Sequence, residues 1–293
     1  MPVKLTNSQI ELLVDLPDEN YQGTRFDHCG KIVSLKYDDL RLSGSETGNM
    51  HGDQNSGKGF YNEFGIDLPL NFDKTPVGDW FHKIGVGLLK KTNTPYFFKN
   101  AYEVKPLSFK VAYASTKIVM ECTSPLLMGY AYKLKKEIEL IESGFKINYY
   151  LKNIGEHEIV TNEYVHNFLI FNNQSIGTDY QLNFPFEIKP DLFIETVNPE
   201  NKVIIGKDTI RFNAAPSRDF FFSNLSGNEL VKAQWELINM KQNLGICETG
   251  DFKTNAINLW GVPHVICPEL FLDINLKPKE FKEWSRTYSV FKL

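Results

Sequence analysis

The chain has 293 residues, of which 42% are hydrophobic and 23% are charged, and its formal net charge is −4. Acidic and basic residues are mixed along the sequence, without the lysine and arginine clusters that a nucleic-acid backbone attracts. No stretch approaches the roughly 18 consecutive apolar residues that a membrane-spanning helix needs. We therefore expect neither nucleic acid nor a membrane as a partner.

The four cysteines, Cys29, Cys122, Cys247 and Cys267, are far apart in the sequence. They form no CxxC pair and no Cys/His cluster with the spacing of a zinc site. The opening MPVKLTNSQIELLVDLPDEN has no apolar segment followed by small cleavage residues, so it differs from a secretory signal. We expect a cytoplasmic protein with reduced thiols and without a bound metal.

Alternation of apolar and polar residues recurs along almost the whole chain. In residues 130–141 (YAYKLKKEIELI) a period of two places apolar side chains on one face and charges on the other, whereas a helical period would spread the charges all round. Similar runs occupy 9–15, 31–37, 107–113, 116–122, 145–151, 159–171, 181–188, 202–205, 209–212, 231–238, 244–248, 256–260, 264–267 and 284–291.

This spacing of strands and turns predicts an all-β chain, either a sandwich or a barrel, rather than alternating βαβ units. Short helices fit only near residues 36–42 and 278–283. No internal repeat, low-complexity tract or linker marks a boundary, so we expect one domain over residues 1–293.

Residues 43–80 are the irregular part of the sequence. They are rich in Gly, Asn and Asp and are longer than an ordinary connection between strands. We expect a flexible tip over Gly44–Gly59 and an ordered segment from Glu63 to Trp80 that packs along the edge of a cleft.

Chemistry is suggested first by a histidine in mid-strand, because no P-loop, dinucleotide-binding turn, HExxH or GxSxG motif is present. In NEYVHNFLIFNN, His166 alternates with Tyr164 and Phe168, so the three share one strand face. The other face carries Val165, Asn167 and Leu169. A lone histidine is more often a buried residue bonded to a carbonyl, and only its near-neutral pKa favours function.

Glu269 is the second candidate. It follows the apolar run Val265-Ile266-Cys267 and precedes Leu270-Phe271-Leu272. Burial raises the pKa of such a carboxyl group unless a partner holds it charged, which suits a catalytic acid or base. A glutamate at a strand end that faces solvent explains the pattern equally well.

Four segments, in order, resemble the aldose 1-epimerases and other galactose-mutarotase-like proteins. YQGTRFDHCGKIVSLKY resembles their first pair of strands, and NEFGIDLP with WFHKIGVGLLKK stands in place of a glycine-rich pocket segment. YVHNF resembles their central histidine strand, and CPELF with INLKPKEFKEWSRTYSVF resembles their closing motif. The resemblance covers essentially the full chain. It implies a large antiparallel β-sandwich (supersandwich) with few short helices.

In that family a glutamate removes the proton of the anomeric hydroxyl group and a histidine protonates the ring oxygen, so the sugar opens and recloses as the other anomer. Carried over, the resemblance implies Glu269 as the base and His166 as the acid, with no cofactor. Both groups can be tuned towards neutral pH, where proton transfer is most effective. Further substrate-binding candidates are Arg25, Glu63, either His82 or Lys83, and, as the acid that holds sugar hydroxyls, Glu248 or Asp251.

The sequence also departs from the family pattern. His82-Lys83-Ile84-Gly85 replaces a histidine before Gly-Phe, and Val165-His166-Asn167-Phe168 replaces Thr-His-Pro-Tyr-Phe-Asn. Mutarotation of a hexose or modified sugar is the leading hypothesis, for a monomer or homodimer. The alternatives on the same scaffold are a non-catalytic carbohydrate-binding protein and a lyase or hydrolase. Arg25 and Lys83 would suit an anionic sugar, although strand-end salt bridges explain them equally well.

Overall fold

The structure, a computed structural model, describes residues 1–48 and 56–293. Within these residues all paired strands are antiparallel, and helix is limited to the 3-10 turn η1 (Pro190–Leu192). The prediction of an all-β chain is confirmed. The short helices expected near 36–42 and 278–283 are wrong, because Asp38 (φ 51°) and Lys279 (φ 75°) form tight turns that a right-handed helix excludes.

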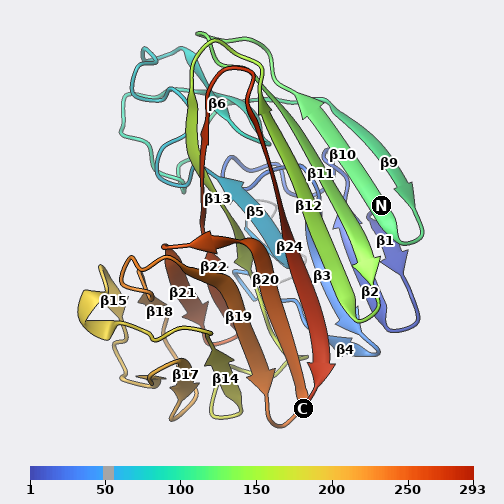
Figure 1. The fold of residues 1–293 in the computed structure, drawn as a ribbon, viewed down its shortest axis with the longest axis vertical. Helices are drawn as coiled ribbons and strands as arrows, with labels where there is room; N and C mark the ends of the chain where they lie inside the picture. Colours follow the sequence, from blue (N-terminus) through green and yellow to red (C-terminus); the bar gives the residue numbers. More distant parts are fainter. Residues whose placement is uncertain (49–55) are drawn as a thin grey trace.

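The larger layer is a ten-stranded sheet whose centre is formed by the long strands beside the C-terminal strand (Figure 1). In spatial order its strands are β16 (Val203–Ile205), β17 (Thr209–Phe212), β14 (Tyr180–Asn183), β19 (Val231–Asn239), β20 (Leu244–Thr254), β24 (Phe281–Lys292), β12 (Gly144–Asn153), β11 (Tyr132–Ile141), β10 (Lys117–Thr123) and β9 (Phe109–Ala114). The expected runs 107–113 and 116–122 form the hairpin β9–β10, and the runs 130–141 and 145–151 form the hairpin β11–β12.

The opposing layer combines two sheets. One contains β1 (Val3–Thr6), β2 (Ile10–Asp15), β3 (Lys31–Tyr37), β5 (Phe60–Phe64), β13 (Ile159–Asn167) and β23 (Leu272–Leu276), with β4 (Leu40–Arg41) paired to β3. The other contains β15 (Thr196–Val197), β18 (Phe220–Phe222), β21 (Ile257–Val262) and β22 (Val265–Leu270). Leu169, just after β13, joins the two sheets by exchanging both backbone hydrogen bonds with Ile266, at 3.0 and 3.1 Å.

A small three-stranded sheet contains β6 (Trp80–Lys83), β7 (Gly87–Lys90) and β8 (Val104–Pro106). Within the segment 43–80, β5 is an inner strand between β3 and β13, which corrects the prediction of an irregular segment. All five residues of β5 are buried, and a strand buried on both faces shows no alternation in its sequence. Of the predicted flexible tip, residues 49–55 lie outside the described residues.

The core lies between the two layers, where aromatic rings from both meet. Phe60 of β5 contacts Phe145 of β12 and Tyr288 of β24, with ring centroids 5.2 and 5.0 Å apart. The predicted alternation is confirmed, because Val165 and Leu169 pack in this core, whereas Phe168 packs in a separate cluster on the opposite face and His166 lines a cleft there. That opposite face carries the site.

In the described part of the chain, no helix is long and apolar enough to cross a membrane. The four cysteines there are free thiols. Burial raises the pKa of the Cys29, Cys122 and Cys267 thiols, which favours the protonated and less reactive form.

Candidate active site

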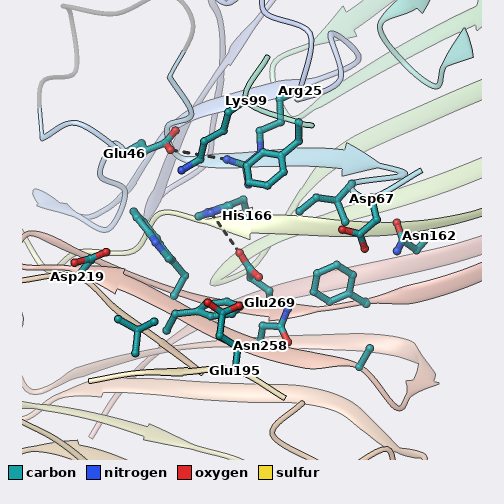
Figure 2. A pocket seen from close by; sticks show the side chains of 17 residues that line it. Arg25, Glu46, Asp67, Lys99, Asn162, His166, Glu195, Asp219, Asn258 and Glu269 are labelled. Atoms are coloured by element: carbon teal, nitrogen blue, oxygen red, sulfur yellow. Dashed lines mark ion pairs between the residues drawn. The ribbon is translucent and has the colours of Figure 1, made fainter. Parts of the chain in front are cut away.

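A cleft of about 560 Å³ opens on the outer face of β13, β21 and β22. This volume lies within the range of ordinary small-molecule sites. The cleft combines aromatic rings, amides and charged groups (Figure 2). Its aromatic walls are Phe98, Phe221, Trp260 and Phe271.

His166 and Glu269 meet in this cleft (Figure 2). On β22, Glu269 has the same parity as Val265 and Cys267, which pack with Phe168 on the cleft side. His166 Nε2 lies 3.3 Å from Glu269 Oε1, and the two side chains are only 4% and 7% exposed. The structure therefore brings together the two residues that the sequence singled out as acid and base.

The imidazole of His166 is enclosed by aromatic rings. It stacks on Phe168 with a centroid distance of 4.1 Å, and the edges of Trp260 and Phe26 approach at 5.3 and 6.0 Å. Burial lowers the pKa of His166 well below its usual value, and the positive charges of Arg25 and Lys99 lower it further. The imidazole is accordingly neutral at pH 7 in the empty cleft.

Glu269 has the opposite shift. Burial raises its pKa to about 8, and the charge of Glu63 adds to the rise, while Arg25 and a hydrogen bond with Asn258 oppose it. Asn258 lies opposite Glu269 in the β21–β22 register. Its Oδ1 accepts the Asn224 N–H at 3.1 Å, which directs its NH2 group towards Glu269.

Together, His166 and Glu269 hold one proton at pH 7. Burial disfavours both charges, so in the empty cleft the proton resides on Glu269. Transfer of that proton across the 3.3 Å contact gives a carboxylate and an imidazolium. With the proton on Glu269 both groups are neutral, and with the proton on His166 they are a carboxylate base and an imidazolium acid. Because the two groups share one proton, they titrate together and not as independent sites.

Arg25, one of the substrate-binding candidates, also lines the cleft. Its guanidinium lies 4.4 Å from the ring centroid of Phe98. Its Nε donates to Glu63 Oε2 at 2.9 Å, and its Nη2 donates to the Tyr164 hydroxyl at 2.9 Å. Its Nη1 faces Glu46 Oε1 at 3.8 Å. These contacts fix Arg25 at the side of the cleft and engage its N–H groups.

Glu63 and Lys83 lie behind Arg25 and do not line the cleft. Lys83 Nζ donates to Glu63 Oε1 at 3.1 Å, and the Tyr164 hydroxyl donates to Oε2 at 2.7 Å. Although burial would raise the pKa of Glu63, the charges of Lys83 and Arg25 outweigh it and hold the pKa below its usual value. The two residues therefore support Arg25 instead of facing a ligand.

The other three predicted substrate contacts also lie away from the cleft. The ring of His82 pairs through Nε2 with the Tyr130 carbonyl at 3.1 Å, and burial lowers its pKa to about 4. Glu248 is buried in the core, and Asp251 accepts hydrogen bonds from the backbone and hydroxyl of Ser285 at 2.8 and 2.9 Å. This corrects the expectation that His82 belongs to the pocket and that Glu248 or Asp251 holds sugar hydroxyls.

Sequence reasoning missed Asn258 and Trp260, which alternate on β21 and point into the cleft. A signal was available, because INLWGV and VICPEL are two short runs close enough to form a hairpin that places Asn258 opposite Glu269. Among the described residues, no group of three or more His, Cys, Asp or Glu side chains could hold a metal ion.

No protein-family model matches the sequence, and no curated protein matches it either. Solved structures are similar to it over its full length. A galactose mutarotase related enzyme from Lactobacillus acidophilus has a TM-score of 0.61 at 11% identity, covering 100% of this chain and 98% of that chain. A galactose mutarotase-like protein from Lactobacillus casei ATCC 334 has a TM-score of 0.60 at 12% identity, covering 99% and 100%.

A GalM/aldose epimerase homologue from C. elegans has a TM-score of 0.52 at 10% identity, covering 100% of this chain and 99% of that chain. At these identities the similarity establishes the fold. The chain has the galactose-mutarotase-like fold, as the resemblance of its sequence segments implied.

Proposed function

We propose that the protein is an aldose 1-epimerase-type enzyme, a mutarotase that interconverts the anomers of a free hexose or a modified sugar. The observation that carries this proposal is the 3.3 Å contact between His166 Nε2 and Glu269 Oε1 inside a cleft of aromatic rings and amides. A pyranose presents apolar ring faces and hydroxyl groups, which suit these two kinds of wall. The fold similarity supports the same substrate class.

The chemistry requires a base and an acid that are neighbours, because the anomeric oxygen and the ring oxygen are bonded to the same carbon. Glu269, as the carboxylate, takes the proton of the anomeric hydroxyl group, and His166, as the imidazolium, gives a proton to the ring oxygen. The bond between the anomeric carbon and the ring oxygen breaks, and a free aldehyde forms. Rotation about the neighbouring C–C bond and closure on the other face, with both proton transfers reversed, give the other anomer.

Binding of the sugar explains how the charged pair arises. In the empty cleft burial keeps the proton on Glu269, which has a pKa of about 8. A bound sugar hydroxyl that donates to Glu269 replaces the hydration that the carboxylate lost, and Arg25 already favours the negative charge. The proton then moves to His166.

The charges of the cleft favour an uncharged sugar. Arg25 is paired with Glu63 and Glu46, and Lys83 is paired with Glu63 behind the cleft, so neither serves as a free anion-binding group. Lys99 is the remaining cation of the lining. It is outnumbered by the carboxylates of Asp67, Glu195 and Asp219. A uronate or a sugar phosphate would meet net repulsion there.

Polarimetry tests the proposal. The α-anomers of glucose, galactose and xylose, with glucuronate and glucose 6-phosphate as charged comparisons, are followed with and without protein. Glu269→Gln and His166→Asn should each lower the acceleration over the uncatalysed rate by about 10²–10⁴-fold. If the protein binds a sugar but accelerates none, it is a carbohydrate-binding protein instead. If activity survives Glu269→Gln, this glutamate is not the base.

A further inference from the structure

Behind the cleft, the chain that follows β13 is joined to β22 by an isolated bridge, and this pairing stops directly beside the catalytic pair. Leu169 and Ile266 exchange two backbone hydrogen bonds. Two residues along, the next such pair would be Asn167 and Pro268, but proline has no N–H to donate. The side chain of Asn167 bridges this gap, because its Nδ2 donates to the Pro268 carbonyl at 2.7 Å.

The amide of Asn167 has no remaining freedom. Its second N–H donates to Glu248 Oε2 at 2.9 Å, and its Oδ1 accepts the Tyr288 hydroxyl at 3.0 Å. Asn167, Glu248 and Tyr288 are all 0% exposed. A buried amide with every hydrogen bond satisfied has one orientation, so the distance from β13 to the Pro268 carbonyl is fixed.

The same polar cluster also holds the other side of Glu269. Arg286 of β24 donates through Nη2 to the Leu270 carbonyl at 2.9 Å and through Nη1 to Glu248 Oε1 at 2.6 Å. It also pairs with Glu163 Oε2 at 2.8 Å. Buried ion pairs of this kind add little to stability, because the loss of hydration offsets the attraction. Fixing the backbone on both sides of Glu269 is a better reason for their presence.

We propose that Asn167 is a positioning residue, which sets the distance between His166 and Glu269 by bridging β13 to the Pro268 carbonyl. It follows His166 on β13 and points to the core face, so it does not touch a bound sugar. Its loss would let the carboxylate move away from the imidazole while leaving the walls of the cleft in place. This inference rests on the proposed function for its kinetic consequences.

The test compares Asn167→Leu with Asn239→Leu. Leucine has the same branched arrangement of side-chain heavy atoms as asparagine and removes its hydrogen bonds. Asn239 is an equally buried asparagine of β19 that bonds to Gln174 and does not line the cleft. For Asn167→Leu we expect kcat to fall about 100-fold, as for a misplacement of about 1 Å, with KM unchanged within about twofold. Asn239→Leu should leave both constants unchanged.

Tyr288→Phe is the milder second variant, because it removes only the hydroxyl that orients the Asn167 amide and keeps the ring stacked on Phe145. It should lower kcat about threefold, again with unchanged KM. A fall in kcat matched by a rise in KM, or an equal effect of Asn239→Leu, would overturn the proposal and make Asn167 a structural asparagine.

A second readout does not depend on activity. The ring nitrogens of His166 sense the ionisation of Glu269 across their contact, so an NMR titration reports the titration of the pair directly. A carboxyl group released from its fixed place regains hydration, so in Asn167→Leu the transition should move down by about one pH unit. If the wild-type protein accelerates no sugar, the proposed function fails, but the NMR titration still tests whether Asn167 positions Glu269. A transition at the same pH in the wild type and in Asn167→Leu would overturn the positioning role of Asn167.

Discussion

Glu269→Gln should make the protein more stable at neutral pH while removing its activity. The pKa of Glu269 is about 8 in the folded chain and 4.5 ordinarily. Between these values the unfolded chain releases a proton that the folded chain keeps, so the carboxyl group lowers stability progressively as pH rises. Glutamine has the same shape but does not ionise, so it avoids this loss.

The magnitude follows from the shift. Each pKa unit corresponds to about 1.4 kcal/mol, so at pH 7 the carboxyl group costs at most about 3 kcal/mol of unfolding free energy. Below pH 4.5 the cost vanishes, because both states are then largely protonated. The stabilising effect of the substitution should therefore grow from near zero at pH 4.5 to its maximum at pH 8.

Urea unfolding of the wild type and Glu269→Gln at pH 5, 6, 7 and 8 measures this difference. Glu200→Gln is a control of opposite sign, because Lys202 and Ser217 lower the pKa of Glu200 to about 2. That carboxylate stabilises the fold above pH 4.5, and its contribution is lost only as pH falls through 2. Its replacement should lower stability equally at all four pH values. A stability gain for Glu269→Gln that is absent, or the same at every pH, would refute the assigned burial of this carboxyl group.

Four further results are expected. Because the pair loses its single proton above pH 8, kcat/KM, corrected for the uncatalysed rate, should be level through neutrality and fall above about pH 8; a rise there would contradict the one-proton mechanism. Glu63→Gln should lower the free energy of unfolding, measured with urea, by about 3–5 kcal/mol, because Lys83 and Arg25 lose a buried partner. An unchanged urea midpoint would show that these ion pairs of Glu63 are dispensable. Trp260→Ala should raise the KM measured by polarimetry about tenfold, because a sugar ring would lose its stacking surface. An unchanged KM would show that no sugar stacks on this ring. Alkylation without reductant should label all four cysteines in denatured protein, and two or fewer labels would indicate disulfides.

The sequence predicted strands best where one face of a strand is exposed. β11 alternates buried and half-buried residues, and its bounds agree closely with the expected run 130–141. β5 escaped detection because it is buried on both faces and so shows no alternation. Sequence pattern identifies a strand by the contrast between its two faces, and an inner strand covered on both sides has none.

The site was predictable in part, for a related reason. His166 and Glu269 were singled out individually, but their contact depends on the pairing of Leu169 with Ile266, a non-local event that local periodicity does not encode. Glu248 was misplaced although its parity on β20 matches that of Ile246, a core residue. Glu248 is buried as the ion-pair partner of Arg286, a residue of β24 near the C-terminal end of the sequence.

Three buried carboxyl groups, those of Glu63, Glu248 and Glu269, are therefore candidates for the base, and their hydrogen-bond and ion-pair partners distinguish them. Glu63 is engaged by Arg25, Lys83 and Tyr164, so its oxygens are already satisfied and its proton affinity is reduced. Glu248 accepts hydrogen bonds from the core and faces away from the cleft. Glu269 faces the cleft without a cation in direct contact, so burial raises its pKa to about 8 and leaves the proton available at neutral pH. A carboxyl group kept short of partners in this way is costly for folding and useful for proton transfer, which is why we propose Glu269 as the base.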